Sequence, residues 1–390
     1  MVNQTRPLEG VRVIDMTRFV SGAYTGTLLA MLGADVIKIE VPTGGDPYRN
    51  QGTAFVDGES GLFTALNLGK RSVMLDLRSV DGLSALEALL STADVFIENG
   101  RPGSLKRLGL DSASVTERYP RLVYGSISGY GQHGPDAGRG GFDLILQAEG
   151  GLMSVTGEPD SGPVKVGVPA LDIGSAVSCA LAIVAALYRR TSNDGTGAVV
   201  SSSLLEFAVS TFTSVAPAYF INGDVPGRIG SHSPTFAPYG AYRANDGYVV
   251  LAGAGSEDLW HRLCDAIDAP ELIGDSRFVT NADRVAHLEH LIAELETRFT
   301  QNSRAYWMAR LSEFGVPAAE VRDLGQVLSS PQVEALGQVQ VDPANPNGQK
   351  IIGAPIQIDG PLPFPGPAPR LGEHTSQVLA ELHVVRRAGR

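Results

Sequence analysis

The stretch VRVIDMTRFVSGAYTGTLLAMLGADVIKIE, residues 11–40, decides the fold. Residues 11–16 and 35–40 have the β-branched content and the length of buried strands, and residues 23–32 between them have a helical composition. Strands that alternate with helices predict an α/β fold with a mostly parallel sheet covered on both faces. The pattern continues with strand-like runs and one more helical stretch at 71–77, 93–98, 121–128 and 81–91.

The turn after the first strand lacks the glycine pattern of a dinucleotide-binding fold. Gly22 and Gly26 are spaced G-x-x-x-G, whereas pyrophosphate binding at a helix start needs G-x-G-x-x-G. Glu40 ends the second strand where a ribose-binding acid would lie, but the glycines outweigh it. The sequence also lacks a Walker loop. NAD and nucleoside triphosphates are therefore not the expected ligands.

The texture of the sequence changes near residue 226. A loop rich in glycine and proline leads into two β-like runs joined by a turn at residues 245–247, and helical periodicity follows. We therefore place a smaller α+β domain at residues 226–325. A chain of 390 residues is long enough for two domains.

Composition argues against several classes of protein. Apolar residues make up 43% of the chain and charged residues 19%, and the net charge of −11 lacks the basic block that nucleic acid requires. The first residues do not resemble a signal segment, and the uncharged run at 173–188 is shorter than the roughly 20 residues of a membrane span. Cys179 and Cys264 have no metal or redox spacing. We expect a cytoplasmic protein without nucleic-acid, membrane or metal partners.

Basic residues gather near the predicted ends of the strands. Ligands of open parallel sheets bind beyond the carboxyl ends of the strands, so these side chains are candidates for a shared site for a phosphate-bearing ligand. The alternative is that each is an ordinary solvated surface charge. The cluster consists of Arg18, Lys38, Arg49, Arg78, Arg101 and Arg107.

Asp172 is the single acid of KVGVPALDIGSA, residues 165–176, and it directly precedes the uncharged helical run. It is a candidate N-cap, whose carboxylate would accept hydrogen bonds from the amides of residues 174 and 175. It is also a candidate nucleophile toward an activated acyl carbon, held ionised by the helix dipole, with Gly174 leaving room for a substrate. The residues alone leave both interpretations open.

Nine segments in order resemble the family III coenzyme A transferases. That family includes formyl-CoA and carnitine-type transferases and, as an isomerase branch, α-methylacyl-CoA racemase. Each segment is weak alone, but nine in family order cover nearly the whole chain. The segments are LEGVRVIDMT, LGADVIKIE, GGDPYR, LNLGKRSVMLDL, ADVFIENGRPGSLKRLGL, PRLVYGSISGYGQHGP, KVGVPALDIGSA, RANDGYVVLA and LGEHTSQVLAEL.

The resemblance implies that Asp172 is the nucleophile of a CoA-transferase. Asp172 would attack an acyl-CoA thioester, pass through an aspartyl anhydride and an aspartyl-CoA thioester, and deliver CoA to an acceptor carboxylic acid. CoA would be a substrate, with no permanently bound cofactor. The resemblance also implies an interlocked homodimer, and a Rossmann-like large domain built from residues 1–225 and 326–390.

The resemblance also implies where CoA binds. The nucleotide would contact Val20 and Ser21 in the first turn, Arg78 beyond the third strand, and Asn99 and Arg107 after the fourth. Arg101 lies between the last two and belongs to the same basic cluster. Two alternative functions remain: an acyl-CoA racemase or epimerase with Asp172 as base, and an acyl-CoA-binding protein without catalysis.

Three departures from the family pattern narrow the activity. Phe142 stands where the racemase branch has a histidine, and an apolar ring cannot carry a proton. Gly140 stands near the place of a basic CoA contact of formyl-type members, with Arg139 as a possible substitute. The tetraglycine lid of that subgroup is also absent, and residues 227–240 are its nearest region. Racemisation is therefore not expected, and a specificity for formate or oxalate is not to be assumed.

Overall fold

The computed structural model describes residues 6–56, 58–252, 255–344 and 348–388. The chain divides into two compact units. The small unit consists of Met153–Lys165 and Ala218–Ser330. The large unit consists of Met1–Leu152, Val166–Pro217 and Pro331–Arg390. The predicted division into 1–225 with 326–390 and 226–325 remains a prediction.

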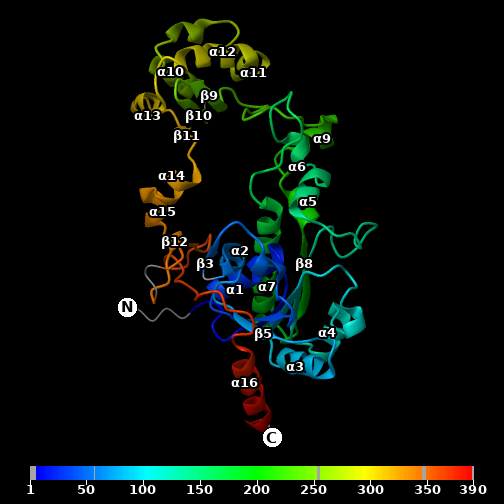
Figure 1. Cartoon of the computed structure of the whole chain (residues 1–390). Coiled ribbons are helices and arrows are strands. Elements are labelled where there is room, and N and C mark those ends of the chain that lie inside the picture. The colour runs from blue at the N-terminus through cyan, green and yellow to red at the C-terminus, as the bar shows by residue number, and fades with distance from the viewer. Residues whose placement is uncertain (1–5, 57, 253–254, 345–347, 389–390) are drawn as a thin grey trace. The chain divides into compact units, whose positions relative to one another are not determined.

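The large unit is built on a six-stranded sheet in which all neighbouring strands are parallel (Figure 1). The strand order reverses between β1 and β6, which makes the gap between their carboxyl ends the place where ligands of such sheets bind. The predicted parallel α/β sheet is therefore confirmed. In spatial order the strands are β5 (Arg71–Met74), β2 (Asp35–Glu40), β1 (Arg12–Met16), β6 (Val95–Glu98), β7 (Val123–Ser128) and β8 (Ala198–Ser203).

Helices cover both faces of this sheet because its strands are apolar on both sides. Val13 and Ile97 belong to the core under α1 (Ser21–Met31) and α7 (Ala170–Ser192), while Ile14 and Phe96 belong to the core on the other face. The helices of that second core are α3 (Val80–Leu90), α4 (Ser112–Arg118) and α16 (Thr375–Ala388).

Helix α16 joins the end of the chain to the outer strand β5. The amide of His374 donates to the carbonyl of Ser72, and Arg71 forms an ion pair with Glu381 at 2.8 Å. The remaining elements of the large unit are η1 (Pro47–Asn50), β3 (Phe55–Val56), β4 (Glu59–Ser60), α2 (Gly61–Leu66), η2 (Lys106–Leu108), α5 (Asp143–Glu149), α8 (Leu204–Ser210), α15 (Pro331–Ala335), β12 (Val339–Gln340) and β13 (Ile351–Ile352).

Helix α7 is buried along one side only. It spans 23 residues, and by length and composition alone it is apolar enough to cross a membrane, although half of its most apolar window is buried in the protein. A buried core helix meets the same criteria. Its buried side includes Cys179 and Ile183, and its opposite side exposes Val177, Leu181 and Tyr188.

The small unit packs helices on a three-stranded antiparallel sheet. Strands β9 (Gly240–Ala244) and β10 (Gly247–Leu251) form the hairpin predicted at residues 245–247, and β11 (Ala318–Glu320) pairs with β10. Its core is centred on Tyr242 and Trp260. The helices are α10 (Glu257–Ala266), η3 (Pro270–Gly274), α11 (Asn281–Ala286), α12 (Leu288–Phe299), α13 (Arg304–Glu313) and α14 (Leu324–Leu328), and α6 (Leu152–Val155) and α9 (Ala216–Asn222) lie at the unit boundaries.

Candidate active site

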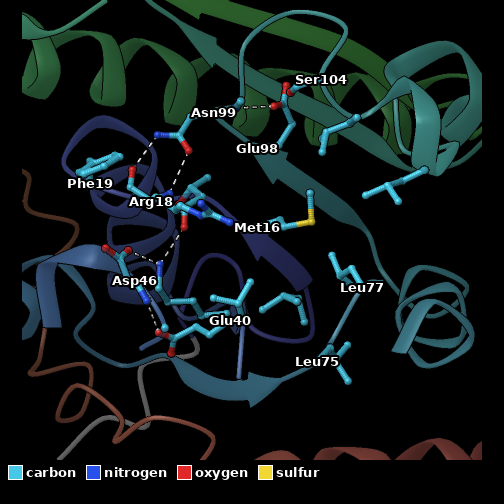
Figure 2. Close-up of a pocket in the computed structure, with 18 of the residues that line it drawn as sticks. Met16, Arg18, Phe19, Glu40, Asp46, Leu75, Leu77, Glu98, Asn99 and Ser104 are labelled. Atoms are coloured by element: carbon cyan, nitrogen blue, oxygen red, sulfur yellow. Dashed lines mark hydrogen bonds and ion pairs between the residues drawn. The ribbon is translucent and has the colours of Figure 1, made fainter. Parts of the chain in front are cut away.

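A cavity of about 530 Å³ opens at the carboxyl ends of β1, β2, β5 and β6, where the strand order reverses (Figure 2). We call it the switch-point cavity. Its walls are mostly apolar, with backbone and polar groups supplied by the turns after β1 and β6, as expected of a small-molecule site. Its lining includes Met16, Arg18, Phe19, Asp46, Leu77, Asn99, Arg101 and Ser104.

The turn after β1 is tied to the end of β6 by one side chain. The Asn99 carbonyl oxygen accepts from the amide of Arg18 at 2.9 Å, and its NH₂ group donates to the Arg18 carbonyl at 2.7 Å (Figure 2). Phe19, next in this turn, has a left-handed backbone with φ of 60°, which is unfavourable for an aromatic residue and typical of functional turns. Asn99 therefore holds the wall of the cavity through its side chain.

Two buried lysines lie beneath the same turn. Lys38 donates to the Thr17 carbonyl at 2.9 Å and forms an ion pair with Asp46 at 2.9 Å. Lys70 forms an ion pair with Asp15 at 2.7 Å and donates to the carbonyl of Ala23 in α1 at 2.7 Å. All four charged side chains are buried. Lys38 lies at the predicted ligand site, since it lines the switch-point cavity, but its charge is paired with Asp46 inside the protein and is not free for a phosphate.

The ionisation of this layer follows from its pairing. Burial alone would raise the pKa of Asp15, but attraction to Lys70 and Lys38 outweighs burial and lowers it. Burial lowers the pKa of Lys70 to about 8, although Asp15 opposes the shift. The lysines are thus structural cations that hold the turn and the start of α1 against the sheet.

Arg49 is likewise committed to the interior. Its guanidinium makes two hydrogen bonds to Glu40, at 2.8 and 2.7 Å, and lies 3.6 Å from the ring centroid of Phe63. The interpretation of Arg49 as a free phosphate-binding cation is therefore wrong, and Glu40 is held by an arginine. A bidentate pair of this kind is strong and geometrically specific, so it fixes the loop after β2.

Asp172 lies in a second, smaller cavity of about 280 Å³ in the large unit. We call it the Asp172 pocket. Phe19, Asn99, Gly100 and Arg101 line both cavities, so the two are neighbours with shared walls. The other residues that line the Asp172 pocket include Ser21, Tyr48, Ser128, Gly129, Arg139, Gly140, Gly141 and Phe142.

The N-cap interpretation of Asp172 is wrong. Helix α7 begins at Ala170, its N-cap residue is Pro169, and no side chain of its own caps it. The amide of Asp172 donates to the Asp143 carboxylate at 3.3 Å, which leaves the Asp172 carboxylate to face the pocket. The side chain is therefore not consumed by helix capping.

Burial raises the pKa of Asp172 to about 6. The negative charge of Asp143 adds to this rise, and a hydrogen bond to Ser21 works against it. At pH 7.5 such a group is ionised, and it is more basic than an ordinary aspartate. A basic, ionised carboxylate in a pocket is the arrangement that covalent catalysis or proton abstraction requires.

Comparison with known proteins identifies the family. The sequence model of CoA-transferase family III matches residues 8–375. This chain belongs to CoA-transferase family III. It is 36% identical to the succinate–glutarate CoA-transferase of Agrobacterium fabrum (strain C58), over 99% of this chain and 98% of that protein. It is 35% identical to the acetyl-CoA:oxalate CoA-transferase of Acetobacter aceti, over 96% of this chain and 95% of that protein. The chain is an enzyme of the CoA-transferase class.

The family assignment extends to structure. The crystal structure of a CAIB/BAIF family protein from Brucella suis matches with a TM-score of 0.87 and 36% identity, over 97% of this chain and all of that one. This chain thus shares its mixed α/β architecture with the Brucella suis protein over nearly its whole length.

The predicted CoA contacts of this family III member fall into two groups. Asn99 and Arg101 line both cavities, and Ser21 and Arg139 line the Asp172 pocket. The second group, Val20, Arg78 and Arg107, is not among the described residues that line either cavity.

The arginines of these groups differ in their partners. Arg78 is 87% exposed and pairs with Asp76 at 3.0 Å. Arg139 pairs with Glu149 at 2.6 Å. The side chain of Arg101 has no hydrogen-bond or ion-pair partner among the described residues, while its backbone carbonyl accepts from the amide of Ser104 at 2.9 Å. The Glu98 carboxylate shapes the same turn by accepting from the amide of Gly100 at 2.7 Å.

Sequence reasoning missed three residues of the site. Tyr48 lines the Asp172 pocket, and burial together with the charge of Asp172 raises its pKa. Glu98 lines the switch-point cavity, and burial raises its pKa. Asp143 accepts from the first turn of α7. The segment GFDLILQ drew attention only for Phe142, and nothing in its spacing indicated that the next residue reaches α7.

Proposed function

We propose that this enzyme moves CoA from an acyl-CoA thioester to an acceptor carboxylic acid, with Asp172 as the covalent nucleophile. The observation that carries the proposal is the ionisable carboxylate of Asp172, which does not cap its own helix and lines a pocket that shares walls with the switch-point cavity. The family III assignment supports the reaction class, and this geometry supports the residue.

The reaction proceeds by four acyl transfers that need no external oxidant or metal. The Asp172 carboxylate attacks the thioester carbon, and the C–S bond breaks. CoA departs as the thiolate, and an aspartyl anhydride remains on the enzyme. The thiolate then attacks the aspartyl carbonyl, which releases the donor acid and leaves an aspartyl-CoA thioester. The acceptor carboxylate attacks this thioester to form a second anhydride. Returning thiolate takes the acceptor acyl group, and the Asp172 carboxylate is regenerated.

We propose that CoA enters through the switch-point cavity and that its thioester reaches the Asp172 pocket. Asn99, Gly100 and Arg101 line both cavities, and this proximity supports the proposed route. Arg101 is suited to an anionic part of a substrate, since it has a guanidinium without a recorded protein partner. The succinate–glutarate and acetyl-CoA:oxalate CoA-transferases among the relatives support short dicarboxylic acids as acceptors.

A racemase or epimerase is less well supported. Proton exchange at the α-carbon needs a second acid–base group opposite Asp172. Phe142 lines the pocket where the resemblance placed the histidine of that branch, and its side chain is 67% exposed.

The exposed side of α7 supports the predicted homodimer. Val177, Leu181 and Tyr188 repeat at helical spacing, and Leu181 and Tyr188 are 70% and 74% exposed. A row of exposed apolar side chains on a 23-residue helix supports a protein–protein contact on this side. We propose that a second copy of this chain covers it. Size-exclusion chromatography with light scattering at micromolar concentration should give a dimer, and a monomer would contradict this assignment.

Mass spectrometry tests the covalent mechanism. The wild-type enzyme is mixed with succinyl-CoA, glutaryl-CoA or acetyl-CoA, trapped with hydroxylamine and digested. We expect a hydroxamate that maps to Asp172 and is absent from the Asp172→Ala variant. Asp111→Ala is the control, because this carboxylate caps α4 and does not line either cavity. Turnover by the wild type without any modification of Asp172 would exclude it as the nucleophile.

A further inference from the structure

The start of helix α7 is capped by a side chain from another helix. The first amides of a helix have no partner within it, and an N-cap side chain usually accepts from one of them. In α7 the N-cap residue is Pro169, whose side chain cannot accept. Instead, one oxygen of Asp143 in α5 accepts from the amides of Leu171 at 2.8 Å and Asp172 at 3.3 Å.

A second residue of α5 completes this support. The buried Gln147 side chain donates to the other oxygen of Asp143, and its carbonyl oxygen accepts from the amide of Val166 at 2.8 Å. Asp143 and Gln147 lie one turn apart on α5, so they hold the chain at Val166 and at the start of α7 together. The segment that delivers Asp172 is thereby attached to α5 by three hydrogen bonds.

The cap is also a charge. The Asp143 carboxylate accepts from amides at the start of α7. In an isolated helix, such free amides would stabilise a negative charge at this terminus. The negative charge of Asp143 instead disfavours ionisation of Asp172, and together with burial it raises the Asp172 pKa.

We propose that Asp143 is a positioning residue for the nucleophile: it fixes the helical turn that carries Asp172 and sets a second negative charge beside its carboxylate. This inference rests on the proposed role of Asp172. It assigns to Asp143 two separable effects, one on the placement of the nucleophile and one on its basicity.

Among the described residues, no charge near the first turn of α7 other than Asp143 has the second effect. The titratable groups on the helices and strands that pack against α7 or line its pocket are Tyr24, Tyr48, Arg101, Tyr124, Arg139, Asp143, Glu149 and Glu206. Of these, only Asp143 shifts the pKa of Asp172, and Ser21 is the hydrogen-bond donor that opposes it.

Two substitutions separate the effects. Asp143→Asn removes the charge and keeps one oxygen to accept from the helix, while its NH₂ group replaces the oxygen that accepts from Gln147. The acid limb of the kcat/KM profile should therefore move down by roughly one pH unit. Asp143→Ala also removes the cap, so kcat should fall by at least roughly tenfold while the KM for acyl-CoA changes little. Asp111→Asn is the control, because it alters the capping carboxylate of α4 and should leave the pH profile at the wild-type position.

The outcomes decide between two failures. If wild type forms the Asp172 adduct but Asp143→Asn keeps both the wild-type acid limb and the wild-type kcat, Asp143 has no positioning role and the inference is overturned. If wild type turns over with no adduct at Asp172, the proposed function falls and the inference falls with it. Melting temperature is measured for each variant, and Asp143→Asn, which keeps the side-chain shape, decides the question even if Asp143→Ala does not fold.

Discussion

The switch-point cavity and the Asp172 pocket share walls, but the charged side chains beside them differ in whether they have an ion-pair partner. At and beneath the switch-point cavity, Lys38, Arg49 and Lys70 are buried, and each has an acidic partner within 2.9 Å. In the pocket, Arg139 is paired with Glu149, but Asp172 has no cationic partner within ion-pair distance among the described residues. The side chain of Arg101, which lines both cavities, is also unpaired among those residues.

This difference separates the charges that hold the fold from the charges that are available for binding and catalysis. A charge buried with its partner is neutralised, so it supports the backbone and offers nothing to a ligand. A partly buried charge without a partner keeps a shifted pKa or a free hydrogen-bonding capacity, which is what binding and catalysis use. The following substitutions test this separation.

The largest effect is expected in the pocket. Asp172→Ala removes the proposed nucleophile, so kcat should fall on the order of 10⁴-fold or more, because no other group supplies the covalent step. Initial rates of CoA transfer between succinyl-CoA and glutarate measure it. An Asp172→Ala variant that keeps a tenth of the wild-type rate would show that the carboxylate acts only in binding.

In the layer beneath the cavity, the expected loss is one of stability. Lys70→Met leaves the buried Asp15 without its ion-pair partner, which should lower the free energy of unfolding by about 3–5 kcal/mol. The double variant Lys70→Met with Asp15→Asn removes both charges and should regain a large part of that loss. Urea unfolding monitored by fluorescence compares the three proteins. If the double variant is no more stable than Lys70→Met, the loss does not come from an unpaired charge.

A smaller stability change of opposite sign is expected in the pocket. The pKa of Asp172 rises from 3.8 to about 6, so the folded state binds more protons than the unfolded state between these values, and stability falls as pH rises through them. Asp172→Asn removes this cost. It should therefore raise the free energy of unfolding at pH 7.5 by about 1–2 kcal/mol, after allowance for partial exposure.

The control for this change is pH. At pH 3.5 Asp172 is protonated in the folded state and mostly protonated in the unfolded state, so the stability difference between wild type and Asp172→Asn should shrink. A difference that is the same at pH 3.5 and pH 7.5 would exclude ionisation of Asp172 as its cause.

The sequence predicted the sheet because burial on both faces leaves a periodic trace. The runs at 11–16, 35–40, 71–77, 93–98 and 121–128 contain β1, β2, β5, β6 and β7. Their apolar side chains identify them without any knowledge of neighbours. Basic residues leave no such trace, since a lysine that ends inside an ion pair and one that binds a ligand look alike in sequence.

The site was predictable only where a residue depends on its own segment. Asp172 stands out by being alone in an apolar run. Asp143, which supports Asp172, does not stand out in the sequence. The amides of Leu171 and Asp172 donate to it from 28 and 29 residues away in the chain. Lys38 was misassigned for the same reason, since its partners Thr17 and Asp46 come from two other loops.

Arg101 gives the smallest effect and the finest test of the comparison. Arg101→Ala should raise one KM by roughly tenfold with little change in kcat, because it removes a charge-assisted contact made equally in ground and transition states. Arg78→Ala is the matched control, since that arginine pairs with Asp76 at the surface, and it should change neither KM appreciably. A rise in the KM for acyl-CoA would assign Arg101 to a phosphate of CoA, whereas a rise in the KM for the acceptor would assign it to the second carboxylate of a dicarboxylic acid. If neither KM moves, an unpaired cation beside the pocket does not mark a binding group, and the separation drawn here between paired and unpaired charges fails at this residue.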